Sequence, residues 1–174
     1  MTDVAMLIKL QQPPTSPYVI RMFEWFDYRD HIKIVMEYPA PCLELITLIS
    51  RQALNEQRVR VIMRQAVQAV NHCLDHGVFH NDIHTGNILV NTRTFNIKLI
   101  DFGCALEYTG KPYPNHKYRG AYDYWPPEVK GKAAFEGKTT NVYHLGKLLQ
   151  KMFPGCRPGV SQGESSDKNT VTHS

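Results

Sequence analysis

The chain has 174 residues, of which 43% are hydrophobic and 21% are charged, and its formal net charge is +4 at pH 7. This length suits one domain or part of a larger one, and the composition is that of a globular protein. The Lys and Arg residues form no dense block, so we expect no nucleic-acid partner. No apolar run approaches the roughly 18 residues of a membrane span, so we expect no membrane partner.

The four cysteines, at positions 42, 73, 104 and 156, are scattered and form no CxxC pair. This spacing favours reduced thiols over a disulfide framework or a zinc ribbon. The N-terminus does not have the pattern of a signal peptide. We therefore expect a cytoplasmic or nuclear location.

The first elements are predicted from hydrophobic spacing. Residues 2–10, TDVAMLIKL, are expected to be the end of an amphipathic helix, which the prolines of the next segment interrupt. Residues 18–27 and 31–37 are rich in β-branched and aromatic residues and flank a short polar turn. This pattern predicts a β-hairpin.

Two helices are predicted after the hairpin. The prolines of YPAP, residues 38–41, make that segment a connector, and a short helix is expected over residues 42–50. Residues 56–76 predict a longer helix, and Gly77 suits the position after its end. The apolar face of that helix contains Val59, Ile62, Ala66, Val70 and Cys73.

The second half of the chain begins with three short apolar runs that predict strands: VF (78–79), NILV (87–90) and IKLI (97–100). Residues 104–125 are expected to be irregular and residues 139–153 to form a buried helix. The polar, Gly- and Ser-rich residues 154–174 predict a disordered tail. The order of elements predicts an α+β fold class.

Two isolated aspartates lie in apolar or turn-forming surroundings, Asp82 in HNDIHTGN and Asp101 after IKLI. A carboxylate is costly to bury unless a positive group meets it. Either residue alone is readily explained as a turn former. Together they indicate a metal ion that carries phosphates.

The spacing around these aspartates matches the parts needed for phosphoryl transfer. Protein kinases use H-R-D-x-x-x-x-N to supply a base and a metal ligand, and D-F-G to supply a second ligand. Here His80-Asn81-Asp82 is followed by Asn87, and Asp101-Phe102-Gly103 follows after a strand-turn-strand. Pro126-Pro127-Glu128 then stands where A-P-E closes the activation segment.

With these motifs the chain resembles serine/threonine protein kinases, and more narrowly the PIM family. VIRMFEWFDYRDHIKIVMEYPAP, AVQAVNHCLDHGVFHNDI and IKLIDFG are the stretches that resemble it. The resemblance implies an incomplete protein-kinase-like fold, from the end of the C helix through the next hairpin and the hinge to the F helix. Residues 1–153 would be a partial catalytic domain, and residues 154–174 a tail that does not resemble a kinase.

The resemblance implies ATP and Mg²⁺ as cofactors. Asp82 would be the catalytic base, and Asn87 and Asp101 would hold the metal. The hinge would be residues 37–41, where a proline removes a backbone donor to adenine. The nucleotide-binding residues would be Glu37, Pro39, Glu44 (near the ribose), Leu89 and Ile100.

The resemblance also implies roles for further residues of the core. Met36 would be the gatekeeper, and Asp3 falls where the glutamate of the C helix belongs. The apolar spine of an assembled kinase core would contain Leu7, Met22, His80 and Phe102.

Several positions depart from the family pattern. Asn81 replaces arginine, so no cation is present there to clamp a phosphorylated activation loop. His84 replaces the lysine that meets the transferred phosphate, and we expect it to act in catalysis beside Asp82. Ala121 replaces a threonine. No glycine-rich loop or V-A-I-K lysine precedes Asp3, so we expect this chain alone to be inactive.

The family implies transfer of the ATP γ-phosphate to Ser or Thr in basic protein segments, by a monomer, in survival, apoptosis and cell-cycle signalling. One alternative is a pseudokinase or kinase fragment that acts as a binding module. Another starts from His72, His76, His80 and His84, which recur every four residues and suggest Zn²⁺. Gly77 separates them onto different elements, which favours the kinase interpretation.

Overall fold

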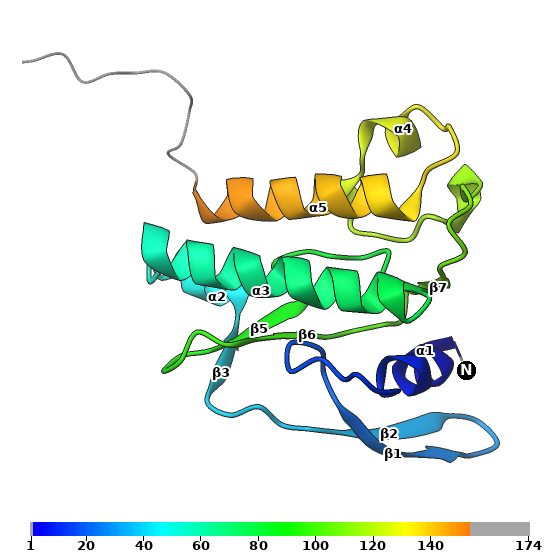
Figure 1. Ribbon diagram of the computed structural model, residues 1–174, viewed down its shortest axis with the longest axis horizontal. Coiled ribbons are helices and arrows are strands. Elements are labelled where there is room, and N and C mark those ends of the chain that lie inside the picture. The colour runs from blue at the N-terminus through cyan, green and yellow to red at the C-terminus, as the bar shows by residue number, and fades with distance from the viewer. Residues whose placement is uncertain (1, 154–174) are drawn as a thin grey trace, which may run out of the picture.

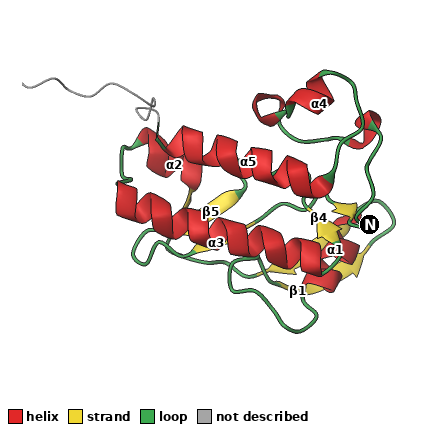
Figure 2. Ribbon diagram, turned by 45° about the horizontal axis from the view of Figure 1, so that its top comes forward, coloured by secondary structure: helices red, strands yellow, loops and turns green. Residues whose placement is uncertain are grey.

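A computed structural model describes residues 2–153, and the predicted tail at 154–174 lies outside the described residues. Helices and short antiparallel strands are mixed along the chain, as Figures 1 and 2 show, which confirms the predicted α+β class. Among the described residues, no helix has both the length and the apolar character needed to cross a membrane.

The helices and strands alternate in short pieces. The helices are α1 (Thr2–Leu10), α2 (Leu45–Ser50), α3 (Glu56–Asp75), α4 (Pro127–Lys130) and α5 (Gly137–Met152), with 3₁₀ turns η1 (Asn115–Lys117) and η2 (Tyr122–Tyr124). The strands are β1 (Met22–Asp27), β2 (Ile32–Met36), β3 (Cys42–Glu44), β4 (Val78–Phe79), β5 (Ile88–Asn91), β6 (Ile97–Leu99) and β7 (Leu106–Glu107).

The strands form three small antiparallel sheets, β1-β2, β3-β5-β6 and β4-β7. The predicted hairpin is confirmed, with Asp27 opposite Ile32 beside the turn. It begins later than predicted, because the segment before β1 pairs with β6 instead: the N–H of Ile20 donates to the carbonyl of Leu99 at 3.0 Å. This pairing attaches the hairpin to the sheet that carries the second aspartate.

Figure 1 shows the resulting layers. Helices α3 and α5 lie side by side, β5 and β6 run along the other side of α3, and α1 lies between these strands and the β1-β2 hairpin. The predicted apolar face of α3 is buried, and Asn55 caps the helix by accepting from the N–H of Arg58 at 2.9 Å. Gly77 has φ +71°, as expected for the residue after a helix end.

Two predictions about elements were wrong. Residues 42–44 are not helical, because Cys42–Glu44 pair with β5 as strand β3, and the helix begins at Leu45. Helix α5 is not buried throughout: it buries His144 and Leu148 and leaves Val142 exposed. The segment predicted as irregular also contains the short strand β7.

Candidate active site

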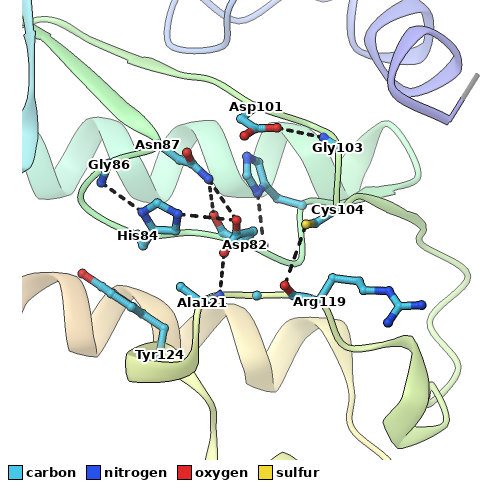
Figure 3. Close-up of polar contacts among 12 residues, drawn as sticks. Asp82, His84, Gly86, Asn87, Asp101, Gly103, Cys104, Arg119, Ala121 and Tyr124 are labelled. Atoms are coloured by element: carbon cyan, nitrogen blue, oxygen red, sulfur yellow. Dashed lines mark hydrogen bonds and ion pairs between the residues drawn. The ribbon is translucent and has the colours of Figure 1, made fainter.

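The loop between β4 and β5 carries the first aspartate, and its carboxylate has three partners (Figure 3). Asp82 Oδ1 accepts from the N–H of Ala121 at 2.8 Å. Asp82 Oδ2 accepts from Asn87 Nδ2 at 3.2 Å and lies 3.4 Å from His84 Nε2. Asn87 Nδ2 also donates to the backbone carbonyl of Asp82, at 3.0 Å. The predicted base therefore has a fixed orientation.

These partners keep Asp82 ionised. Burial raises the pKa of this carboxyl, but the hydrogen bonds from His84 and from the Ala121 N–H and the nearby histidines favour the charged form, and the net pKa is below its usual value. A charged carboxylate is the form that accepts a proton, so the electrostatics suit a general base.

His84 is oriented from both sides. The N–H of Gly86 donates to His84 Nδ1 at 3.0 Å, so that nitrogen carries no proton in this geometry and the hydrogen is on Nε2, which faces Asp82. The ring also lies against Gly86, where an added Cβ would be 3.0 Å from His84 Cε1. His84 is therefore brought to the base as predicted, with its Nε2 directed at the Asp82 carboxylate.

His80 holds the loop that carries Asp82 through contacts of both its ring nitrogens. Its Nε2 lies 3.0 Å from the carbonyl of Ile100, and its Nδ1 accepts from the N–H of Asp82 at 3.3 Å. Burial lowers the pKa of His80, so the ring is neutral, and it packs on Phe102 with ring centroids 4.7 Å apart. The residues predicted as an apolar spine are all buried: Leu7, Met22, His80 and Phe102.

A cavity of about 360 Å³ joins the predicted hinge to the second aspartate. It brings together most of the predicted nucleotide-binding residues, since its lining includes Met36, Glu37, Pro39, Leu89, Ile100 and Asp101. Asp3 also lines it. Glu44 does not: it is exposed and lines a separate cavity of about 490 Å³ beside His84.

Asp101 lies at the rim of the 360 Å³ cavity with its carboxylate partly engaged. Its Oδ1 accepts from the N–H of Gly103 at 3.1 Å, and its backbone is left-handed, with φ +62°. No cluster of three or more His, Cys, Asp or Glu side chains suited to a metal occurs within residues 2–153. Mg²⁺ needs no such cluster, because it binds through one or two protein oxygens together with phosphate oxygens and water. Asp101 and the amide oxygen of Asn87 fit that donor set.

The side-chain carboxylate of Glu37 is hydrogen-bonded within the protein rather than directed at a nucleotide. Its Oε1 accepts from Lys98 Nζ at 2.6 Å and from the N–H of Arg21 at 2.7 Å. Oε1 of Glu37 is thus engaged within the fold, which leaves its backbone as the expected contact to a ligand at the hinge. Lys98 was missed from the sequence, although a single cation inside the apolar run IKLI is a signal for a buried partner.

The histidines suggested as zinc ligands are used within the fold. His72 Nε2 lies 3.1 Å from the carbonyl of Leu10, and His76 contacts two further carbonyls. Burial raises the pKa of the Cys104 thiol, and the nearby Asp82 and Asp101 raise it further. A raised pKa disfavours the reactive thiolate.

Comparison with known proteins agrees with this geometry. The family model described as "Protein kinase domain" matches residues 2–174. The chain is 37% identical over 142 residues to serine/threonine-protein kinase pim-2 of Danio rerio, covering 80% of this chain and 45% of that protein.

Two further relatives show the same relation. Serine/threonine-protein kinase prk-2 of Caenorhabditis elegans is 33% identical over 80% of this chain and 32% of its own length. NUAK family SNF1-like kinase 1 of Homo sapiens is 32% identical over 91% of this chain and 24% of its own length. The chain thus spans less than half of the length of these curated relatives, and it belongs to the protein kinase domain family.

Proposed function

We propose that this chain is the catalytic-loop and hinge portion of a PIM-like serine/threonine kinase, which transfers the γ-phosphate of ATP to protein Ser or Thr. The observation that carries the proposal is the fixed, ionised carboxylate of Asp82, between the N–H of Ala121 and the amide of Asn87. The family membership makes ATP and a divalent cation the expected cofactors.

In the proposed reaction, Asp82 receives the proton of the attacking hydroxyl. A carboxylate has about four lone-pair sites. Ala121, Asn87 and His84 occupy three of them, which leaves one on Oδ1 for the hydroxyl. Proton acceptance at that atom makes the hydroxyl oxygen a better nucleophile and keeps it aimed by the fixed carboxylate.

Asn87 and Asp101 would hold Mg²⁺, and the hinge backbone with Leu89 and Ile100 would hold adenine. The cation supplies neutralisation of phosphate charge. His84 stands where kinases have a lysine, and its Nε2 is directed at Asp82 Oδ2 while its Nδ1 accepts from Gly86, so no ring hydrogen is left for a phosphate oxygen. The charge that the lysine would place beside the transferred phosphate is then missing, so we expect a slow enzyme.

The printed sequence contains no G-x-G-x-x-G loop. That loop and a strand lysine position the phosphates in kinases, and positioning is most of the catalysis. We therefore propose that the chain binds nucleotide, while turnover requires a longer polypeptide that supplies these parts.

Basic protein segments are the proposed substrates. The cavity of about 490 Å³ beside His84 is lined by two exposed carboxylates, Glu44 and Asp123, and by one exposed cation, Lys151, so its charged lining is acidic by one charge. Acidic residues at this position favour Lys and Arg next to the phosphorylated hydroxyl. A monomer that acts in the cytoplasm or nucleus, in survival and cell-cycle signalling, completes the PIM-like proposal.

The test is phosphate transfer from ATP to a Ser peptide with flanking arginines, by the longer protein that contains this chain. We expect Asp82→Asn to lower the rate by at least about a hundredfold, in line with the loss of a general base. Asp75→Asn is the matched control, because Asp75 is exposed at the end of α3. Equal rates for parent and Asp82→Asn would overturn the proposal.

The second candidate is a pseudokinase, and the replacement of the usual lysine by His84, whose Nδ1 accepts from the N–H of Gly86, favours it. His84→Lys separates the two. In an enzyme weakened at this position, lysine raises kcat more than it changes KM, because the gain is in the transition state. If kcat stays unmeasurable with lysine at position 84, the pseudokinase candidate is favoured.

A further inference from the structure

The residue before the predicted base holds two distant backbone carbonyls with one side-chain nitrogen. Asn81 Nδ2 donates to the carbonyl of Cys104 at 3.0 Å and to the carbonyl of Lys117 at 3.2 Å. The first carbonyl lies directly after Asp101-Phe102-Gly103, and the second belongs to the last residue of η1. The orientation of the amide is determined by them, because its oxygen would be repelled by both carbonyls.

The environment of Asn81 is energetically unfavourable, which indicates that its two hydrogen bonds stabilise the fold. Its side chain is fully buried, its backbone is left-handed with φ +63°, and Asn81 Oδ1 has no hydrogen-bond partner among the described residues. Asparagine tolerates this backbone region better than most residues. A buried unpaired oxygen is unfavourable, so the two donated bonds are the gain at this site.

Close packing continues the same attachment toward the base. Gly120 lies against the loop so tightly that an added Cβ would be 2.8 Å from the carbonyl oxygen of Asn81. The next residue, Ala121, donates its N–H to Asp82 Oδ1 at 2.8 Å. The segment end held by Asn81 is thus the one that orients the carboxylate.

We propose that Asn81 is a positioning residue, a neutral clamp that keeps the segment 104–121 against the catalytic loop and so aims Asp82, without a phosphate on that segment. Its effect on turnover rests on the proposed function, whereas the clamp itself is a property of the fold. An arginine at this position would pair with an anion on the segment, such as a phosphate. An amide that donates to two carbonyls needs none.

The test is amide hydrogen exchange of the 174-residue chain, which requires no activity. Asn81→Asp keeps the size of the side chain and its tolerance of positive φ, but it faces the two carbonyls with acceptors. We expect protection of the Ala121 amide and of segment 104–121 to fall by at least about tenfold, the order expected for two lost hydrogen bonds. Protection of Ile62 and Ala69 in the core of α3 should change much less.

Two controls make the result specific. Asn91→Asp is the matched substitution, because Asn91 uses only its Oδ1, as an acceptor from the N–H groups of Arg93 and Thr94. It should leave segment 104–121 unchanged. Thr109→Glu adds a negative charge to the exposed part of the segment and should also leave protection unchanged, since the clamp needs no charge.

A pH series adds a readout that general destabilisation does not move. In Asn81→Asp, protection should recover as the pH falls from about 7 to about 5, because burial raises the pKa of a carboxyl and its protonated form donates again. The proposal is overturned if segment 104–121 exchanges as fast in the parent as in Asn81→Asp, or if core and segment lose protection equally.

Discussion

The ion pair behind the hinge gives the sharpest energetic prediction. Lys98 Nζ and Glu37 Oε1 are 2.6 Å apart, and the two side chains are only 20% and 22% exposed. The same Oε1 accepts from the N–H of Arg21. A partly buried, charge-assisted hydrogen bond contributes about 1.5–3 kcal/mol, more than a surface pair. The pair links β6 to the segment that follows β2, so it determines where the hinge lies.

The perturbation is a double-mutant cycle of Lys98→Met and Glu37→Gln, measured by urea unfolding. We expect a coupling energy of about 1.5–3 kcal/mol. The matched cycle is Arg60→Met with Glu56→Gln on α3, whose side chains are 74% and 66% exposed at 2.6 Å. That pair should give about 0.3–0.5 kcal/mol. A Lys98–Glu37 coupling as small as that of the surface pair would refute the reasoning.

Four further substitutions test the packing, the hinge and a buried histidine. Gly120→Ala should destabilise the fold by about 1–3 kcal/mol in thermal unfolding, since its Cβ would be 2.6 Å from Tyr118 Oη. Gly146 lies on α5 with open space beside it, so Gly146→Ala should stabilise the fold by about 0.5–1 kcal/mol in the same assay. Pro39→Ala should tighten ATP binding by about 1 kcal/mol in calorimetry, because it adds a backbone donor to the cavity, and unchanged affinity would show that the hinge is misplaced. Burial lowers the pKa of His144 from 6.5 to about 4, so the unfolded chain binds more protons than the folded chain between these pH values. The contribution of the neutral ring to the free energy of unfolding is complete above pH 6.5 and falls by about 3 kcal/mol toward pH 4. Urea unfolding midpoints should show that this loss is smaller in His144→Gln.

The catalytic loop could be predicted from the sequence because its geometry is local. The spacing of Asp82 and Asn87 places both in one tight loop, and the structure brings them within 3.2 Å. The helix α3 was predicted for a related reason, since its spacing and its Gly77 end are read within one element. Periodicity and turn chemistry need no knowledge of distant partners.

What the sequence did not predict depends on contacts between distant segments. Residues 42–44 became a strand because β5 offered backbone partners, and a three-residue run has no periodicity that reveals this. The partner of Lys98 is 61 residues away, and those of Asn81 are 23 and 36 residues away. The loss of arginine at position 81 was visible in the sequence, but the contacts that replace it were not.

The residues assigned to the nucleotide site by resemblance lie in two different cavities. Pro39, Leu89, Ile100 and Asp101 line one cavity, as a shared nucleotide site requires. Glu44 lines the neighbouring cavity, because β3 ends there and turns directly into α2. Residues at strand ends are the hardest to assign to one of two adjacent sites.

Magnesium-dependent binding of ATP to the 174-residue chain tests the central claim most directly, because the hinge cavity and both side chains proposed to hold the metal lie within it. Isothermal calorimetry of the parent should show ATP binding that Mg²⁺ strengthens. In Asp101→Asn the strengthening by Mg²⁺ should be lost while residual binding remains, and Asp75→Asn should behave as the parent does. ATP binding with the same dependence on Mg²⁺ in Asp101→Asn as in the parent, or no ATP binding by the parent, would contradict the account.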